Sequence, residues 1–298
     1  VRIKIVSIDN PLCTLAECPV WNAAEQALYW TDIPKRRIWR YDWTVQETQL
    51  VWQGEQQVGG FAFAESGDMI LCTDAGVYRL AHRSIAESGR APALLHDIRM
   101  ADDERFNDIT TDPAGRIFAG TFTERREHGI LYRLEKDADP VPVLRDIGTS
   151  NGMTFSLDLA HFYHTDSHVK TITRYDYDTG TGNISNPQPF YHGTPENGSP
   201  DGLTIDTDGF FWVACYRGGK VLRLNQAGQI VDQLLIPAAN VSSVMFGGPD
   251  LNQLFITTAR QENGDEKHAS GATDEDQGGR VFRASLGAQG RPEWLTAL

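Results

Sequence analysis

Polar side chains recur at one position of a segment that is repeated along this 298-residue chain. Six related segments begin roughly 41 to 50 residues apart. The residues directly before them are Glu17, Gly59, Asn107, Asn151, Asp201 and Ser242. Gathered at one place, the two carboxylates and two carboxamides of this set would form an all-oxygen group. Such a group suits a hard or borderline divalent cation such as Ca²⁺, Mg²⁺, Mn²⁺ or Zn²⁺.

These residues need a fold that brings equivalent positions of a repeat together. Each unit reads as a short apolar strand, a turn rich in Asp, Gly, Pro and Ser, and a second apolar strand. A third strand with a basic residue usually follows, as in "RIWRYD" and "GILYRLE". No helical period is sustained over three turns. The sequence therefore predicts an all-β, six-bladed β-propeller, with residues 1–298 as a single domain and "RIKIVSI" (2–8) completing the last blade.

In a propeller the first strand of every blade lines the central channel, so the residues before the six segments should converge there. The Asp-Gly of "SPDGLTID" (199–206) is also a common turn signal, but a turn does not explain Glu17. Burying Glu17 with Asp201 is costly unless a counter-charge is present, and a metal ion would remove that cost. The alternative is that these residues are structural polar groups that fill the channel.

The charge of the chain limits its partners. It carries 40 acidic and 27 basic side chains, for a formal net charge of −13. This balance argues against a surface that follows a phosphate backbone, so nucleic acid is not expected as a partner. No apolar run approaches the roughly 20 residues that span a bilayer, and the start "VRIKIVSIDN" does not resemble a secretory signal. We expect a cytoplasmic protein without a membrane partner, as a monomer or a small homo-oligomer.

One segment departs from the repeat. Residues 262–279, "ENGDEKHASGATDEDQGG", are polar and acidic and contain no large apolar residue, so they cannot build a core. We interpret them as a solvated loop inserted in the last blade, with a cation-binding or lid function as the alternative.

Aspartates after the second strands receive a structural interpretation. Asp32, Asp74 and Asp166 each follow a threonine at this place in the repeat. Short acidic side chains accept hydrogen bonds from nearby backbone amides. These three residues are therefore predicted to fix hairpins rather than to bind a ligand.

Longer motifs identify a family. They are "AECPVWNAAEQALYWTDI", "RFNDITTDPAGRIFAGTF", "SNGMTFS", "YDYDTGTG", "SPDGLTIDTDGFFWVA" and "FGGPDLNQLFITTAR", and they extend from about Leu15 to Arg260. With them the chain resembles the regucalcin and gluconolactonase family, also called the senescence marker protein, gluconolactonase and luciferin-regenerating-like family. The resemblance implies a six-bladed propeller that is a metal-dependent lactonase.

The resemblance also implies roles for particular residues. The single divalent ion of the family, here Ca, Zn, Mn, Mg or Fe(II), would be held by Glu17, Asn151 and Asp201. The substrate side would be formed by Arg105 and Asn107, and by Glu124 as in some members. All of these residues lie in or next to the motifs quoted above.

The expected reaction is hydrolysis of a sugar 1,4- or 1,5-lactone to its aldonic acid. A metal would act as Lewis acid on the carbonyl, and Asp201 is the candidate general base. Arg105 and Asn107 would orient the sugar through its hydroxyls or its ring oxygen. Two alternatives stay open: a phosphotriesterase-like hydrolase of the same fold, and a calcium-binding propeller without catalysis.

Overall fold

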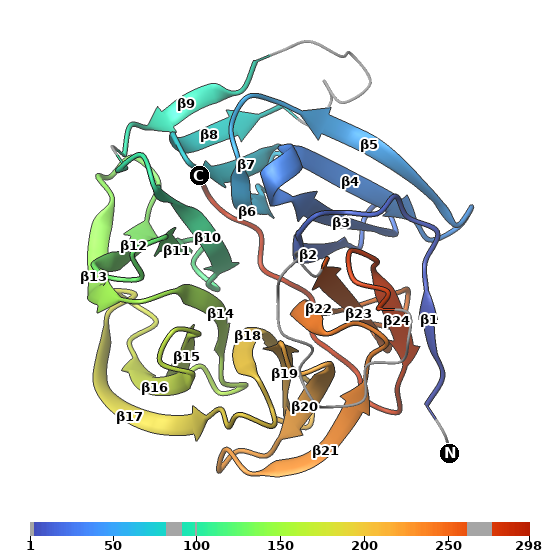
Figure 1. Ribbon diagram of the computed structural model, residues 1–298. Coiled ribbons are helices and arrows are strands. Elements are labelled where there is room, and N and C mark those ends of the chain that lie inside the picture. The colour runs from blue at the N-terminus through green and yellow to red at the C-terminus, as the bar shows by residue number, and fades with distance from the viewer. Residues whose placement is uncertain (1–2, 82–90, 99, 261–275) are drawn as a thin grey trace.

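The computed structural model describes residues 3–81, 91–98, 100–260 and 276–298. Within these ranges the strands form six antiparallel sheets of four strands each. Figure 1 shows the sheets arranged as blades around a central axis. The predicted all-β, six-bladed β-propeller is confirmed. No helix in the described ranges is long and apolar enough to cross a membrane.

Each blade is formed by strands that follow one another in the sequence, from the axis outwards. Blade 1 contains β2 (Ala16–Asn22), β3 (Ala27–Asp32), β4 (Arg37–Asp42) and β5 (Glu47–Gln53), and a 3₁₀ turn (Ile33–Lys35) follows β3. Blade 2 contains β6 (Val58–Phe63), β7 (Met69–Thr73), β8 (Gly76–Leu80) and β9 (Ala93–His96). Blade 3 contains β10 (Glu104–Thr111), β11 (Ile117–Thr123), β12 (Gly129–Leu134) and β13 (Val141–Ile147).

The other three blades repeat this order, and the last one uses both ends of the chain. Blade 4 contains β14 (Ser150–Phe155), β15 (His161–Asp166), β16 (Thr171–Tyr177) and β17 (Ile184–His192). Blade 5 contains β18 (Ser199–Ile205), β19 (Phe211–Tyr216), β20 (Lys220–Leu224) and β21 (Ile230–Leu235). Blade 6 contains β22 (Asn240–Gly247), β23 (Gln253–Ala259), β24 (Phe282–Ser285) and β1 (Ile5–Ser7).

Strand β1 closes the ring. It pairs with β24 in antiparallel register, with Ile5 opposite Ala284. This confirms the prediction that "RIKIVSI" joins the last blade. The acidic segment 262–279 lies outside the described residues except for 276–279, which come just before β24.

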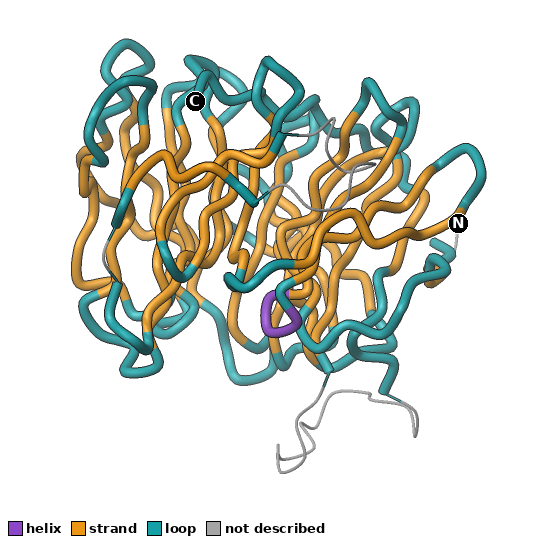
Figure 2. Tube along the Cα trace, turned by 90° about the horizontal axis from the view of Figure 1, so that it is seen from above, coloured by secondary structure: helices purple, strands orange, loops and turns teal. Residues whose placement is uncertain are grey.

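The burial of the strands explains their sequence patterns. The inner strand β6 and the second strand β7 are buried along their whole length. Such strands read as continuous apolar runs because neighbouring blades cover both of their faces. The outer strand β17 is largely exposed. Pro187 and Pro189 have no backbone N–H, which limits pairing of this edge strand with another strand. Figure 2 shows that the strands run between two layers of loops.

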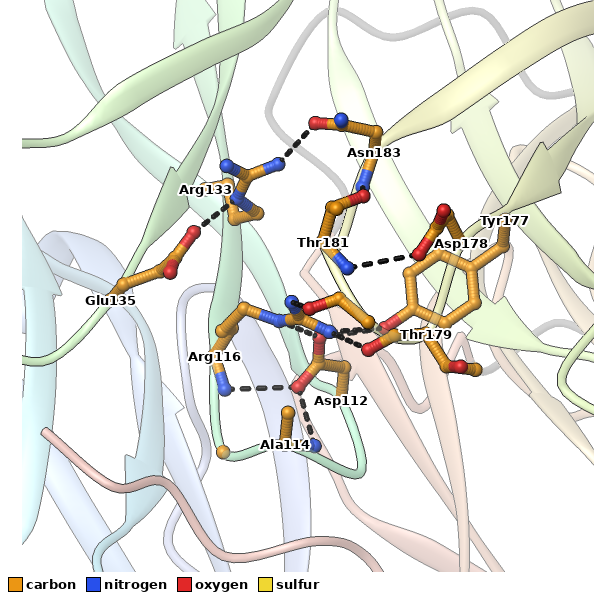
Figure 3. Close-up of polar contacts among 12 residues, drawn as sticks. Asp112, Ala114, Arg116, Arg133, Glu135, Tyr177, Asp178, Thr179, Thr181 and Asn183 are labelled. Atoms are coloured by element: carbon orange, nitrogen blue, oxygen red, sulfur yellow. Dashed lines mark hydrogen bonds and ion pairs between the residues drawn. The ribbon is translucent and has the colours of Figure 1, made fainter.

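A buried polar cluster joins blade 3 to blade 4 (Figure 3). The Nε of Arg116 donates to Asp112 at 2.5 Å, and the hydroxyl of Tyr177 donates to the same carboxylate at 2.7 Å. The guanidinium also donates to the carbonyls of Thr179 and Gly180, in the turn after β16. Because Asp112 is fully buried, this ion pair fixes how the two blades pack against each other.

The segment after β24 crosses the middle of the ring, where Figure 1 shows it in red. Gly290 forms a β-bridge with Asp206 of blade 5, and Thr296 forms one with Ala64 of blade 2. Between them the ring of Trp294 packs edge-on against Phe155 of blade 4, with centroids 5.7 Å apart. Residues 290–296 therefore tie several blades together across the channel.

Candidate metal centre in the channel

Every inner strand has a break in its register at an equivalent place. The breaks lie between Glu17 and Val20, Val58 and Gly60, Phe106 and Ile109, Asn151 and Met153, Pro200 and Leu203, and Val241 and Ser243. A β-bulge interrupts the alternation of side chains and re-aims the residues next to it. The same local distortion thus positions the candidate residues of all blades.

Four of the polar residues predicted at the channel are buried beside these bulges. Glu17, Asn107, Asn151 and Asp201 lie on β2, β10, β14 and β18, and each is at most 8% exposed. Asn107 donates from Nδ2 to Oδ1 of Asn151 at 2.8 Å. Burial, and then the nearby charge of Glu17, raises the pKa of Asp201. The structure therefore brings residues from four blades together.

Glycines next to the candidate ligands are required by the close approach of the inner strands. A Cβ at Gly152 would collide with the backbone around Asp201, and a Cβ at Gly202 would collide with Ser243. Asp201 and Gly202 thus lie inside β18, not in a turn. In blade 1 the corresponding residue is Cys18, which is buried and has a φ of 47°. Its thiol occupies the space between β2 and Phe61 of β6.

Arg105 lies beside this group, whereas Glu124 lies at the surface. The Nη1 of Arg105 donates to Oδ1 of Asn107 at 2.5 Å and to the carbonyl of Phe106 at 3.0 Å. Its guanidinium carbon lies 4.8 Å from the centre of the Phe122 ring. Glu124 is exposed in the turn after β11, and its backbone amide donates to the carbonyl of Asp103.

The aspartates after the second strands accept hydrogen bonds from backbone amides as predicted, but most of these amides do not lie in the hairpins that they were predicted to fix. Asp166 binds the amides of Gly148 and Thr149, and Asp32 binds those of Thr14 and Leu15. These amides belong to the segments that lead into β14 and β2. These aspartates therefore hold the segments that lead into the inner strands of Asn151 and Glu17. Of the hydrogen bonds described for them, only the one that the amide of His168 donates to Asp166 lies within a hairpin.

Burial, together with neighbouring negative charges, raises the pKa values of the carboxyl groups in the channel. Burial, followed by the charge of Asp108, raises the pKa of Glu17 to about 8. Burial and the charges of Glu17 and Asp108 raise the pKa of Asp201 well above its ordinary value. Burial lowers the pKa of Arg105 to about 10, although the nearby carboxylates oppose this shift. One guanidinium thus offsets only part of the charge of three carboxyl groups.

Asp108 is a member of this group that sequence reasoning missed. Strand alternation places it on the face opposite to Asn107, but the bulge between Phe106 and Ile109 lets both side chains reach the channel. Burial raises the pKa of Asp108 to about 6. The only sequence signal was its polar character within the run "RFND".

A cavity of about 270 Å³ lies along the channel on the side of Asp108. It is lined by residues that follow the candidate ligands on the inner strands, such as Cys18, Met153 and Leu203, and by Arg291 and Glu293. Burial raises the pKa of Glu293, although Arg291 opposes the shift. The segment that crosses the channel therefore contributes charged residues to the wall of this cavity.

The donor set fits a hard divalent cation. Oδ1 of Asp201 is buried and has no hydrogen-bond partner among the described residues. An unpaired carboxylate oxygen close to a second carboxylate is costly, and a cation is the partner that would satisfy both. Across the described ranges no three His, Cys, Asp or Glu side chains form a metal-binding group. The candidate centre therefore depends on the carboxamide of Asn151 besides Glu17 and Asp201.

Comparisons with known proteins agree with this architecture. A sequence model described as the SMP-30/Gluconolactonase/LRE-like region matches residues 15–260. The pentonolactonase XacC of Haloferax volcanii is 36% identical over 296 residues, which cover 98% of each chain. A 6-deoxy-6-sulfogluconolactonase of Pseudomonas putida is 35% identical over 291 residues, which cover 95% of each chain.

A solved structure shares the fold over nearly the whole chain. It is described as a calcium-binding protein, regucalcin, from Agrobacterium tumefaciens, and it superposes with a TM-score of 0.88 at 24% identity. The superposition covers 98% of this chain and 97% of the other. The blades described above are therefore those of an experimentally observed propeller.

Proposed function

Because the chain belongs to the SMP-30/gluconolactonase/LRE-like family, we propose that it is a metal-dependent lactonase that opens a sugar lactone to the aldonic acid. The observation that carries the proposal is the buried Oδ1 of Asp201 near Glu17, which has no hydrogen-bond partner in the part of the chain that the structure describes. Two full-length relatives support the substrate class, since their names describe a pentonolactonase and a sulfogluconolactonase.

Glu17, Asn151 and Asp201 are the proposed ligands of the ion. When bound, a divalent cation would supply Lewis acidity toward a lactone carbonyl and stabilise the negative charge that develops on its oxygen. Two carboxylates balance the two positive charges of the ion, and the neutral carboxamide adds an oxygen donor without adding charge. The raised pKa values of Glu17 and Asp201 support the assignment, because the site disfavours two uncompensated negative charges.

Asp201 is the proposed general base. Addition of water to the lactone carbonyl carbon requires an acceptor for one water proton, and a carboxylate at this position can take it. When the ring C–O bond breaks, the same carboxyl group can return the proton to the leaving oxygen, which becomes a hydroxyl of the product. Asn151 cannot act in this way because a carboxamide does not accept a proton at neutral pH.

Arg105 and Asn107 are the proposed substrate-binding residues. Arg105 is half-buried, and among the described residues its guanidinium donates only two hydrogen bonds, to Oδ1 of Asn107 and to the carbonyl of Phe106. A guanidinium has five N–H donors, so donors remain for the hydroxyls of a sugar. Glu124, in the exposed turn after β11, is proposed as an outer contact for larger substrates.

Lactone hydrolysis after removal of metal tests the proposal. Protein stripped with EDTA should hydrolyse pentono- and hexono-lactones at the uncatalysed rate and regain turnover with one of Ca²⁺, Mg²⁺, Mn²⁺ or Zn²⁺. A phosphotriesterase would show turnover mainly on phosphotriesters. A calcium-binding propeller without catalysis would bind the ion and show no turnover on either substrate, which would contradict the proposed function.

A further inference from the structure

The peptide before each proposed ligand is held by a side chain of the preceding blade. In all three cases the carbonyl oxygen of the residue before the ligand accepts a hydrogen bond. The donors are Ser242 Oγ to Ala16 at 2.6 Å, Asn107 Nδ2 to Ser150 at 2.8 Å, and Ser167 Oγ to Pro200 at 2.6 Å. The blades concerned are 6 and 1, 3 and 4, and 4 and 5, so the pattern is repeated around the ring.

These bonds act where the backbone is irregular. Each of the three carbonyls lies next to the bulge that directs the following side chain into the channel. Each inner strand is the edge of its sheet, so one side of its backbone has no partner strand. On that side a side-chain donor from the preceding blade restrains the peptide.

Ser167 has a second contact that concerns Asn151 directly. Its hydroxyl has one proton, which it donates to the carbonyl of Pro200, and it therefore accepts from Nδ2 of Asn151 at 2.8 Å. Nδ2 of Asn151 is thus turned toward Ser167, and Oδ1 is turned toward Asn107. One hydroxyl sets both the rotation of the carboxamide of Asn151 and the peptide that precedes Asp201.

Ser242 of blade 6 holds the peptide before the third proposed ligand, Glu17. It is fully buried, and its Oγ lies 3.0 Å from Oγ1 of Thr257 and 2.6 Å from the carbonyl of Ala16. Ser242 occupies in β22 the position that Asp201 occupies in β18. The side chain at this position of blade 6 therefore holds the strand of Glu17 in place.

We propose that Ser167 and Ser242 are positioning residues that preorganise Asn151, Asp201 and Glu17 for a divalent cation. The inference rests on the proposed function, because it assumes that these three residues are the ligands. Hydrogen bonds to metal ligands set the ligand geometry, and their removal typically costs 10-fold to 100-fold in metal affinity. The two serines should behave in this way although neither of them is a ligand.

Calorimetric titration of the metal-free protein with one cation tests the inference. The cation is whichever of Ca²⁺, Mg²⁺, Mn²⁺ and Zn²⁺ binds the wild type most tightly. Ser167→Ala and Ser242→Ala should each weaken its affinity by about 10-fold or more. Ser167→Thr, which keeps the hydroxyl, should retain an affinity close to that of the wild type.

Thr73→Val is the matched control. Thr73 is a buried hydroxyl residue of blade 2, where it donates to the carbonyl of Gly76 and accepts from the amide of Ala75. Blade 2 contributes no proposed ligand, so the control should leave metal affinity unchanged. The melting temperature of each metal-free variant shows how far a loss of affinity reflects general destabilisation.

Three further outcomes separate this inference from the proposed function. If Glu17→Gln abolishes binding but both serine variants bind as the wild type does, the inference is wrong and the metal site stands. If Ser167→Thr loses as much affinity as Ser167→Ala, or if Thr73→Val loses as much as the serine variants, the serines are only structural. If Glu17→Gln binds normally, the site itself is misplaced and both proposals fail.

Discussion

Replacing Glu17 by glutamine should stabilise the metal-free protein while abolishing tight metal binding. In the folded state burial and the charge of Asp108 raise the pKa of Glu17 from 4.5 to about 8. In the unfolded chain water solvates this carboxylate freely. At neutral pH, folding therefore requires either that Glu17 take up a proton or that its negative charge be buried. Glutamine has nearly the same shape and carries no charge, which removes this requirement.

The size of the effect follows from the two pKa values. Below pH 4.5 the carboxyl is protonated in both states, and the variant and the wild type should be equally stable. Between pH 4.5 and about 8, Glu17 is mostly deprotonated in the unfolded wild type but still protonated in the folded state. The free energy of unfolding of the wild type therefore falls by about 1.4 kcal/mol per pH unit in this range. The free energy of unfolding of Glu17→Gln should therefore exceed that of the wild type by less than about 1 kcal/mol at pH 5 and by about 3 kcal/mol at pH 7. In melting temperature, the latter corresponds to roughly 5 °C or more.

Thermal melting in EDTA at pH 5 and pH 7 measures this difference. Glu47→Gln, at an exposed glutamate of β5, is the control for the loss of one negative charge. Adding the preferred cation should raise the melting temperature of the wild type but not that of Glu17→Gln, because the variant lacks a ligand. A variant that melts at or below the wild-type temperature in EDTA at pH 7 would refute the argument that Glu17 is destabilising without a metal.

Three further changes separate chemistry, substrate binding and packing. Asp201→Asn should lower kcat by about 10³ or more at saturating metal, and near-normal turnover would eliminate Asp201 as the base. Arg105→Ala should leave metal affinity intact but lower kcat/KM by about 10-fold to 100-fold, with a larger loss on sugar lactones than on valerolactone; equal losses on both would make Arg105 a structural residue. Asp112→Asn should lower the free energy of unfolding by about 3 to 5 kcal/mol in urea, because it leaves the buried guanidinium of Arg116 unpaired (Figure 3). A loss below about 1 kcal/mol would show that the cluster is solvated.

The fold could be predicted from the sequence because the buried strands of the core repeat at a regular spacing. Continuous apolar runs such as "MILCT" of β7 occur where a strand is buried on both faces, and their spacing gives the blades. The position before each first strand could be predicted in the same way. Four of its six members, Glu17, Asn107, Asn151 and Asp201, lie together in the channel. Ser242 lies at the same position of blade 6, but its hydroxyl donates to the carbonyl of Ala16.

The rest of the site depends on geometry that strand periodicity does not contain. Asp108 was missed because a bulge cancels the alternation rule at that place. Ser167 was missed because its role arises only when blade 4 packs against the carbonyl of Pro200 in blade 5. Residues 290–296 have no periodic pattern, so their path across the channel is set by tertiary bridges to blades 2 and 5.

The pairing of β1 with β24 has a consequence for how the protein is made. The ribosome synthesises β1 near the beginning of the chain and β24 near its end, so blade 6 stays incomplete during tens of seconds of translation. Blade 6 also stands between blade 5, which carries Asp201, and blade 1, which carries Glu17. The blade between them is therefore incomplete until β24 has been made. Ser242, which holds the peptide before Glu17, belongs to this last blade, so on the proposed function the metal site would be preorganised only in the last step of maturation.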